Sequence, residues 1–396
     1  TMPALTKFID GTGPVWTGNL FPFLFITIAC GAVSGFHALI ASGTTPKMLA
    51  NENQACLIGY GGMLMESFVA IMALVSACII DPGVYFAMNS PMAVLAPAGT
   101  TDVVASAAQV VSGWGFSITP DTLHQIASEV GEQSIISRAG GAPTLAVGMA
   151  YILHGSLGGL MDVSFWYHFA ILFEALFILT AVDAGTRAAR FMLQDLLGVI
   201  SPGLKKTSSL PANLLATALC VLAWGYFLHQ GVVDPLGGIN TLWPLFGIAN
   251  QMLAGMALML CAVVLFKMKR QRYAWVALLP TSWLLICTLT AGWQKSFSPD
   301  TKVGFLAIAN KFQAMIDSGN IPPQYTESQL AQLVFNNRLD AGLTIFFMIV
   351  VVVLALFSIK TALAALKEDK PTAKETPYEP MPENLDAIET QAKGAH

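Results

Sequence analysis

Residues 21–50 read FPFLFITIACGAVSGFHALIASGTTPKMLA and join the apolar start of a membrane span to a second half rich in Gly, Ser and Thr. On a period of 3.6 residues, Gly31, Ser34 and Gly35 fall on one stripe, and the two glycines have the GxxxG spacing that lets another helix backbone come close. A helix that only faced lipid would have no use for this stripe. We therefore predict that the segment packs inside protein.

The same segment should not form one continuous helix. The small polar run after Ile40 should end the first helix, and Pro46 suits the first turn of a second helix with Thr45 as its N-cap. Broken backbone at membrane depth persists only where it is buried in protein or lines a water-filled cavity, because unpaired backbone groups are costly in hydrocarbon. The segment is therefore predicted to line a substrate route.

The composition is that of a membrane protein. Of the 396 residues, 55% are hydrophobic and 11% are charged, and the mean hydropathy is +0.62. Soluble domains carry about 25% charged residues. The net charge of −4, without a basic patch, argues against a nucleic-acid partner.

The sequence carries no signature of catalysis or of a metal site. Six cysteines without a CxxC pair favour free thiols over a disulfide framework or a metal site. A GxSxG elbow, a Walker lysine and an HExxH motif are all absent from the sequence. We therefore expect no enzyme activity, no cofactor and no metal.

Seven apolar runs are long enough to cross a bilayer, which takes about 20 residues. They occupy residues 20–40, 58–80, 165–181, 211–228, 243–266, 273–292 and 341–360. The sequence thus predicts an all-α fold: a polytopic membrane helix bundle of about seven transmembrane helices, with residues 1–363 as the transmembrane region.

Basic residues give these spans an orientation. They gather in three connections that the predicted topology places on one side: Arg187, Arg190, Lys205 and Lys206; Lys267, Lys269, Arg270 and Arg272; Lys360 and Lys367. The positive-inside rule places that side, and the C-terminus, in the cytoplasm. Residues 81–140 are then an external cap, and residues 364–396, rich in Pro and mixed charge, a disordered cytoplasmic tail.

Two stretches depart from simple spans. A single crossing by residues 140–160 would put Arg187 on the wrong side, so these residues are predicted to form a re-entrant or peripheral hairpin. The lead-in VDPLGGINTLWPLFGIANQ before and within the span at Trp243 is interrupted by Gly, Pro and polar residues. This span and residues 21–50 are the candidates for discontinuous helices.

Glu66 and His37 are the candidates for proton coupling near the start of the chain. Glu66 shares a helix face with small residues, and a carboxylate inside a bundle is expensive unless it is paired or protonated. It either carries a proton or cation, or makes a hydrogen bond that holds two helices together. His37 either binds substrate and relays a proton, or bonds to a backbone carbonyl.

Four further polar residues are candidates for substrate binding, together with Ser34, Gly35 and His37: Thr44, Thr45, Asn250 and Gln251. Thr44 and Thr45 stand with Lys47 at a predicted helix start that suits a carboxylate, although Lys47 can equally be a plain cytoplasmic lysine. Asn250 and Gln251 lie adjacent in GIANQMLAG. Neutral amides in a span can hold a substrate, or they can join helices.

Glu174 is a second acid deep in a span and a third candidate for proton coupling. Asp183 and Arg187 are spaced i, i+4 at the predicted cytoplasmic end. That spacing indicates an ion pair that orients the helix or acts as a gate latch.

Four long runs carry a family resemblance. They are GAVSGFHALIASGTTPKMLANE, IGYGGMLMESFVAIMALV, FWYHFAILFEALFILTAVDAGTRAARFMLQDLLG and LWPLFGIANQMLA. With the KETPYEPMPE tail they resemble the carbon starvation protein A family of bacterial inner-membrane transporters over nearly the whole chain. The resemblance implies uptake of peptides or pyruvate, proton-coupled in some members, and the broken-helix fold of the amino acid, polyamine and organocation transporters. It also implies that an N-terminal portion of the same protein precedes Thr1.

The leading hypothesis is a proton-coupled importer of short peptides or pyruvate, active during carbon starvation in the bacterial inner membrane and working by alternating access. Residues 21–50 and the span from Trp243 would enclose the substrate, while Glu66 or His37 exchanges the proton. The alternative is a membrane nutrient sensor that signals through its cytoplasmic tail.

Overall fold

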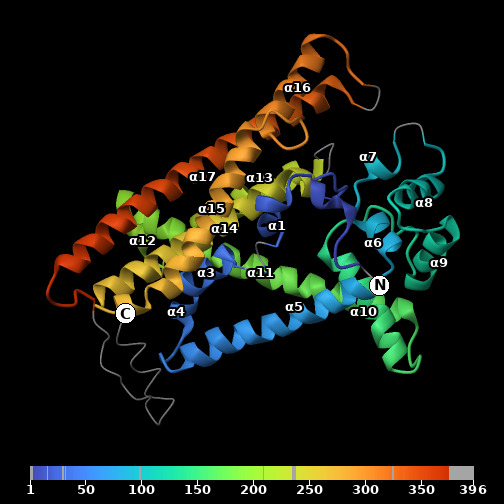
Figure 1. Cartoon of the computed structure of the whole chain (residues 1–396). Helices are drawn as coiled ribbons and strands as arrows, with labels where there is room; N and C mark the ends of the chain where they lie inside the picture. Colours follow the sequence, from blue (N-terminus) through green and yellow to red (C-terminus); the bar gives the residue numbers. More distant parts are fainter. Residues whose placement is uncertain are drawn as a thin grey trace.

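The computed structural model describes residues 3–15, 17–28, 31, 33–97, 100–207, 209–233, 238–322 and 325–373. Over these residues every regular element is a helix (Figure 1). The predicted disordered tail, residues 364–396, is wrong for residues 364–367, which continue α17, and its part beyond residue 373 lies outside the described residues. Hydropathy therefore identified the fold class correctly.

Six helices are long and apolar enough to cross a membrane. They are Cys56–Ile79 (η2 followed by α5), Val163–Ile200 (α11), Leu210–Val233 (α13), Leu245–Lys267 (within α14, Gly238–Lys267), Trp275–Phe297 (α15) and Glu327–Lys367 (α17). They cover all the predicted spans except the first. The polytopic helical bundle is thus confirmed, with six such helices rather than seven in the described part of the chain.

The first predicted span is divided. It contains α1 (Leu20–Thr27), α3 (Gly35–Gly43) and the short α4 (Thr45–Met48). The prediction that this segment is discontinuous is confirmed. Only the break after Ile40 was predicted, and the structure has a further break between α1 and α3. Ser34 marks the start of α3. Its backbone is extended, with φ −100° and ψ 117°, and its Oγ accepts the His37 N–H at 3.2 Å, so Ser34 is the N-cap of α3.

The second break falls close to its predicted place. Helix α3 ends at Gly43, and α4 begins with Pro46 in its first turn. The N-cap position belongs to Thr44 rather than Thr45, and the Thr44 side chain makes no cap bond. Its hydroxyl instead donates to the Ile40 carbonyl at 3.1 Å, because the backbone of Thr44 is already helical.

Helix α14 is the centre of the larger helical group. It packs against α17, α15, α3, α13 and α1 (Figure 1). The 3-10 helix η3 (Gln271–Tyr273) joins α14 to α15, and α16 (Phe305–Asp317) packs on α17. The start of the chain (η1, Lys7–Asp10) and α12 (Pro202–Lys205) complete the elements outside the cap.

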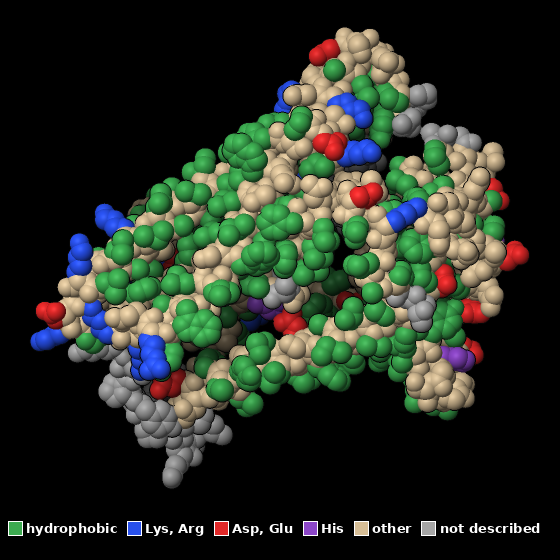
Figure 2. Space-filling model, in the orientation of Figure 1, with side chains coloured by type: hydrophobic (Ala, Val, Ile, Leu, Met, Phe, Trp, Pro, Cys, Tyr) green, Lys and Arg blue, Asp and Glu red, His purple; other side chains and the backbone are tan. Residues whose placement is uncertain are grey.

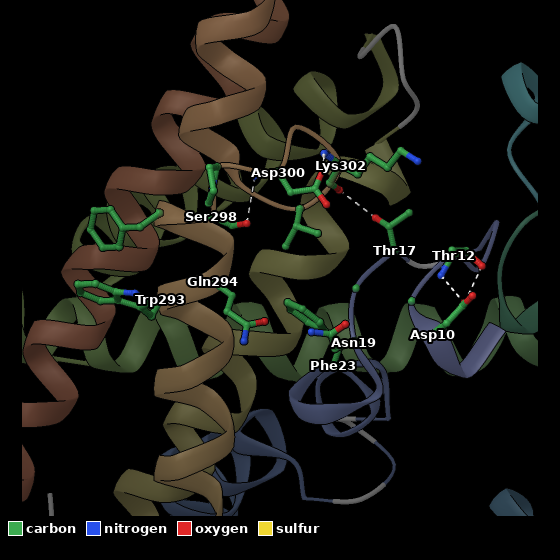
Figure 3. Close-up of a pocket in the computed structure, with 15 residues that line it drawn as sticks. Asp10, Thr12, Thr17, Asn19, Phe23, Trp293, Gln294, Ser298, Asp300 and Lys302 are labelled. Carbon is green, nitrogen blue, oxygen red and sulfur yellow. Dashed lines mark hydrogen bonds between the residues drawn. The ribbon is translucent and has the colours of Figure 1, made fainter.

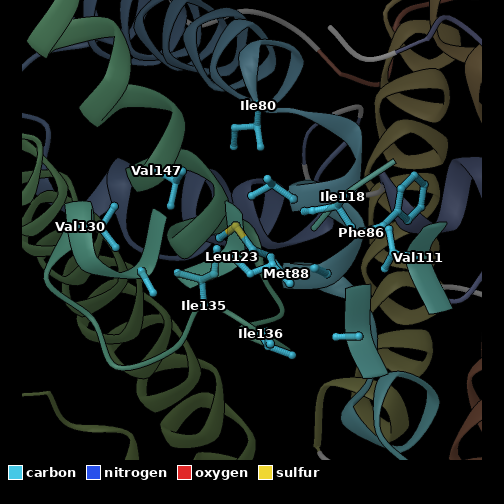
Figure 4. Close-up of a cluster of buried hydrophobic side chains, with 14 of the residues drawn as sticks. Ile80, Phe86, Met88, Val111, Ile118, Leu123, Val130, Ile135, Ile136 and Val147 are labelled. Atoms are coloured by element: carbon cyan, nitrogen blue, oxygen red, sulfur yellow. The ribbon is translucent and has the colours of Figure 1, made fainter. Parts of the chain in front are cut away.

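Residues 81–140 form a packed helical unit. It contains α6 (Pro82–Asn89), α7 (Met92–Leu95), α8 (Val103–Gly113) and α9 (Pro120–Val130). Their apolar faces share one core, which includes Met88, Val111, Leu123 and Val130, each at most 2% exposed (Figure 4). Burial of these side chains stabilises the unit by roughly 1.5–3 kcal/mol each before entropy is counted.

Residues 140–160 do not form the predicted hairpin. They contain one helix, α10 (Gly141–Ser156), which packs against α11 and α5. A Cβ added to Gly148 would lie 2.4 Å from the Ser76 carbonyl oxygen, so only glycine allows α10 to approach α5 this closely. Gly148 therefore serves helix packing, whereas Gly158 and Gly159, with φ of 63° and 74°, lie in the turn between α10 and α11.

Two of the three basic connections, after α14 and at the end of α17, lie together at one end of the bundle. Figure 2 shows Lys and Arg side chains where α14 and α17 end. Lys269 Nζ donates to the Ala365 carbonyl at 2.7 Å and joins the α14–α15 turn to the end of α17. The helical unit of residues 81–140 lies at the opposite end of α5 from α4 (Figure 1).

Candidate functional site

The break between α1 and α3 lies against two adjacent amides of α14. Asn250 and Gln251 are 3% and 1% exposed. Gln251 Nε2 donates to the Phe25 carbonyl in the last turn of α1, and Asn250 Oδ1 accepts the Phe36 N–H of α3 at 2.8 Å. One amide therefore satisfies a carbonyl freed at the end of α1, and the other a free N–H at the start of α3.

Close backbone approach makes these bonds possible. A Cβ on Gly35 would overlap the Asn250 carbonyl oxygen and the Leu253 side chain, and a Cβ on Gly247 would lie 2.6 Å from the Ile26 carbonyl oxygen. Nothing described lies within 4 Å of a Cβ on Gly31. The predicted GxxxG contact is therefore wrong for Gly31, while Gly35 and Gly247 carry the packing of α14 on both half-helices.

Each amide keeps one polar atom unpaired. Among the described residues, Asn250 Nδ2 and Gln251 Oε1 are buried without a hydrogen-bond partner. Buried polar groups are nearly always satisfied in native proteins, and an orphan commonly marks a bound water, ion or ligand. A donor and an acceptor side by side at a broken helix can hold a small polar molecule.

His37 and Glu66 lie in contact and form an ion pair when His37 is protonated. His37 Nε2 of α3 lies 3.4 Å from Glu66 Oε1 of α5, and the two side chains are 46% and 48% exposed. The sequence indicated these residues separately, and the structure brings them together. Two groups that can each carry a proton, in contact between a broken helix and its neighbour, can couple protonation to the position of α3.

The face of α5 around Glu66 is more open than its small residues suggested. Nothing described lies within 4 Å of a Cβ on Gly59 or Gly62, and Glu66 itself is half exposed. The prediction that this face packs within a bundle is therefore wrong for the described part of the chain. The partner of the Glu66 carboxylate is instead His37.

Glu174, on α11, stands apart from this pair. It makes no hydrogen bond or ion pair with any other described residue. His168 bonds to the Ser164 carbonyl at 2.8 Å rather than to Glu174. The structure therefore does not join Glu174 to the other candidates for proton coupling.

The second break is held by local contacts. Thr44 and Thr45 hydroxyls both donate to the Ile40 carbonyl, at 3.1 and 3.2 Å. Lys47 Nζ lies 4.2 Å from the ring centroid of Phe191 on α11, a cation–π contact that gives this lysine a packing role. Both threonine hydroxyls thus already donate to the backbone. Towards any other group they can only accept a hydrogen bond.

The predicted ion pair on α11 is present. Arg187 Nη2 lies 2.7 Å from Asp183 Oδ2, and Arg187 Nη1 also lies 3.7 Å from Met48 Sδ of α4. Arg187 therefore links α11 to the end of the opening segment. Because Asp183 is 67% exposed, the pair itself contributes little to stability.

Sequence reasoning missed two buried ionisable residues, Lys295 of α15 and Asp340 of α17. They are 6% and 3% exposed, and Lys295 Nζ lies 5.3 Å from the ring centroid of Phe23 on α1. Both fall just outside the predicted spans 273–292 and 341–360. Drawing those spans a turn longer would have marked them, since ionisable residues inside a bundle are expensive and usually functional.

These features define a class of protein: a polytopic helical membrane protein with a discontinuous helix held by buried amides, as in secondary transporters. A family model described as "Carbon starvation protein CstA" matches residues 1–291, and the chain belongs to this family.

Relatives agree with this assignment. The chain is 93% identical over its whole length to the protein named "Peptide transporter CstA" of Escherichia coli (strain K12), of which it covers 56%. It is 58% identical, over 96% of its length, to "Pyruvate/proton symporter BtsT" of the same organism, again covering 56% of that protein. The chain thus spans about half the length of these curated relatives. No solved structure matches it.

Proposed function

We propose that the protein contributes the discontinuous-helix half of a secondary transporter that imports short peptides or pyruvate together with protons. One observation carries this: Asn250 and Gln251 hold both ends of the break between α1 and α3, and each keeps a buried polar atom without a partner among the described residues. The relatives named as a peptide transporter and as a pyruvate/proton symporter support the same class. This is a transport role rather than a catalytic one.

The substrate site lies at the break. Asn250 Nδ2 can donate to a substrate carboxylate, and Gln251 Oε1 can accept from a substrate N–H. Ser34, Gly35 and His37 lie at the start of α3, within a turn of this position. Thr44 and Thr45, at the next break, line the continuation of the route toward the end of the bundle that carries the basic connections.

The His37–Glu66 pair supplies the coupling proton. With His37 protonated and Glu66 ionised, their attraction holds α3 against α5. A proton taken up by Glu66 removes that attraction and frees α3 to move, and release of the proton restores it. Glu174, on α11, is a second acid available to the proton path.

The membrane orientation follows from the basic connections. The positive-inside rule places them, and the C-terminus, in the cytoplasm, with the chain in the inner membrane and the cap of residues 81–140 outside. The Asp183–Arg187 pair then stands at the cytoplasmic end, where Arg187 also contacts Met48. It can serve as a latch between α11 and α4.

Uptake by the full-length protein in liposomes tests this. Labelled pyruvate and labelled Ala-Ala are offered with and without an imposed inward proton gradient. We expect accumulation of at least one of them that needs the gradient. In Glu66→Gln the gradient should no longer drive accumulation, while exchange of substrate without a gradient persists.

Glu174→Gln is the matched variant, because this carboxylate has no described partner. It should retain more gradient-driven uptake than Glu66→Gln. Absence of uptake of both compounds by the wild-type protein would refute the proposed function, and full proton-driven accumulation by Glu66→Gln would refute the role of the pair.

A further inference from the structure

A buried cation lies near one end of the bundle. Lys295, in the last turn of α15, is 6% exposed, and no other Lys or Arg in the described part of the chain is buried. An ionisable side chain inside a membrane bundle is costly and usually serves a function. The roles proposed above for the break and for the His37–Glu66 pair make no use of it.

Aromatic rings from two other elements lie beside the Lys295 ammonium group. Its Nζ is 5.3 Å from the ring centroid of Phe23 on α1 and 5.9 Å from that of Phe305 at the start of α16. Both rings are themselves buried. Ring faces attract a cation within about 6 Å. Lys295 therefore joins α1, which ends at the break, to α15 and α16.

A polar cavity borders the Phe23 ring. It has a volume of about 560 Å³, within the roughly 300–1,000 Å³ typical of small-ligand sites. Phe23, Asn19 and Gln294 are among the residues that line it (Figure 3). Lys295 is not a lining residue, although its neighbour Gln294 and the Phe23 ring both are. The Phe23 ring therefore lies between the cavity and the ammonium group.

The cavity and Lys295 lie on the outer side of the break. The basic turn at Arg270 and Arg272 precedes α15, and the positive-inside rule places that turn in the cytoplasm, so the last turn of α15 is on the outside. Phe23 belongs to α1, whose last turn bonds to Gln251. A substrate that moves from the cavity to the break would therefore pass Phe23 and the Lys295 ammonium group.

A carboxylate is the group that this arrangement suits. A carboxylate that leaves water for the interior of a bundle needs a cation or several hydrogen-bond donors. The Lys295 ammonium group has three N–H donors, so it can bind a carboxylate and keep other partners. The amides of Asn19 and Gln294 can donate to the same group within the cavity. Asp10 and Asp300, the acids of the lining, are exposed and bonded within their own turns, so water screens their charge.

We propose that Lys295 binds the carboxylate of the substrate at the outer entrance and that the Phe23 ring is the gate that covers it. Rotation of the ring away from Nζ would exchange a cation–π contact for an ion pair with the substrate. The inference rests on the proposed transport function and deepens it. It assigns the substrate class as small monocarboxylates, which includes both pyruvate and peptides with a free C-terminus.

Calorimetry with the full-length protein in detergent tests this binding. Ala-Ala and pyruvate carry the carboxylate, whereas Ala-Ala amide and pyruvamide lack its charge. Lys295→Met removes the ammonium group and keeps most of the side-chain length. It should raise the Kd for the carboxylate ligands at least about tenfold, because a hydrogen bond between charged groups is lost. Lys295→Arg should recover part of the affinity.

The gate is tested by the rate of association in stopped-flow fluorescence. Phe23→Ala removes the ring that covers Lys295 and should speed association of the carboxylate ligands severalfold. Phe347→Ala is the matched variant, because this ring packs against the same apolar core from α17 and does not line the cavity. It should leave the association rate unchanged.

Two controls separate binding from a structural role of Lys295. Lys311→Met removes an exposed lysine of α16 and should leave every Kd unchanged. The Kd values for the two amides should be the same in wild type and Lys295→Met. A purely structural lysine would instead lower the unfolding temperature when replaced and would weaken carboxylate and amide ligands alike.

The outcomes are distinct from those of the uptake experiment. Equal Kd of wild type and Lys295→Met for the carboxylates, an equal loss for carboxylates and amides, or no binding of either carboxylate would overturn the inference. An unchanged association rate in Phe23→Ala would overturn the gate. Absence of all uptake, with carboxylate binding that depends on Lys295, would overturn the transport function and leave this site standing.

Discussion

Gly35→Ala is the most informative single change at the break. The added methyl would overlap the Asn250 carbonyl oxygen and the Ala254 nitrogen, which are backbone atoms of α14 and cannot rotate away. Helix α3 must therefore move off α14. The Phe36 N–H bond to Asn250 Oδ1, 2.8 Å long, lengthens with it.

The expected cost has two parts. Overpacking a tight contact costs about 1–3 kcal/mol. Weakening one backbone hydrogen bond adds about 0.5–1.5 kcal/mol. We therefore expect a loss of roughly 2–4 kcal/mol in the free energy of unfolding, together with a large fall in uptake, because the shift displaces Asn250 from the break.

Gly31→Ala is the matched control. It is the other glycine of the same GxxxG spacing, and a Cβ there meets nothing within 4 Å. Thermal unfolding of the full-length protein in detergent, with uptake in liposomes, compares the two. Equal stability of Gly35→Ala and Gly31→Ala would show that α3 does not pack against α14 through Gly35.

Three further changes have expected outcomes. Gln251→Leu leaves a carbonyl of α1 unpaired, so denaturant unfolding should show a loss of about 1–3 kcal/mol; no loss would refute the bridging role. The Tyr151 hydroxyl bond, 2.6 Å long, holds the pKa of Glu129 below 4.5, so stability is lost as the pH falls through the folded value. Tyr151→Phe should flatten this acid loss in melts between pH 7 and 3, and an unchanged slope would contradict the cause. Asp183→Asn should change stability by under about 1 kcal/mol yet alter uptake kinetics if the pair with Arg187 is a latch; unaltered kinetics would exclude the latch.

Hydropathy predicted the spans because length and apolar content are local properties of the chain. The discontinuity of residues 21–50 was also visible, since Gly, Ser, Thr and Pro cluster there. The break before Ser34 was not predicted, although Ser34 is a good N-cap residue, because Ser and Gly also occur inside closely packed helices. The two ends of this break are held by the pair of amides on α14, more than 200 positions away in sequence.

The same reasoning explains the other differences. The glycines at 140–160 indicated a hairpin, but Gly148 is needed where α10 packs against Ser76 of α5. Only the fold reveals this contact. Glu66 and His37 each stood out by residue type, but nothing in their sequence spacing showed that His37 of α3 would contact Glu66 of α5. Their pairing depends on the fold of the chain between α3 and α5, which no local pattern specifies.

The most direct test of the central claim is the reactivity of Ser34→Cys in full-length protein whose native cysteines, the six of this chain included, are replaced. A membrane-impermeant thiol reagent should label this position at the break, and saturating Ala-Ala or pyruvate should slow the labelling. Leu172→Cys, on the exposed apolar face of α11, should stay unlabelled. No reaction at position 34, or a rate that substrate does not change, would contradict a substrate route through the break.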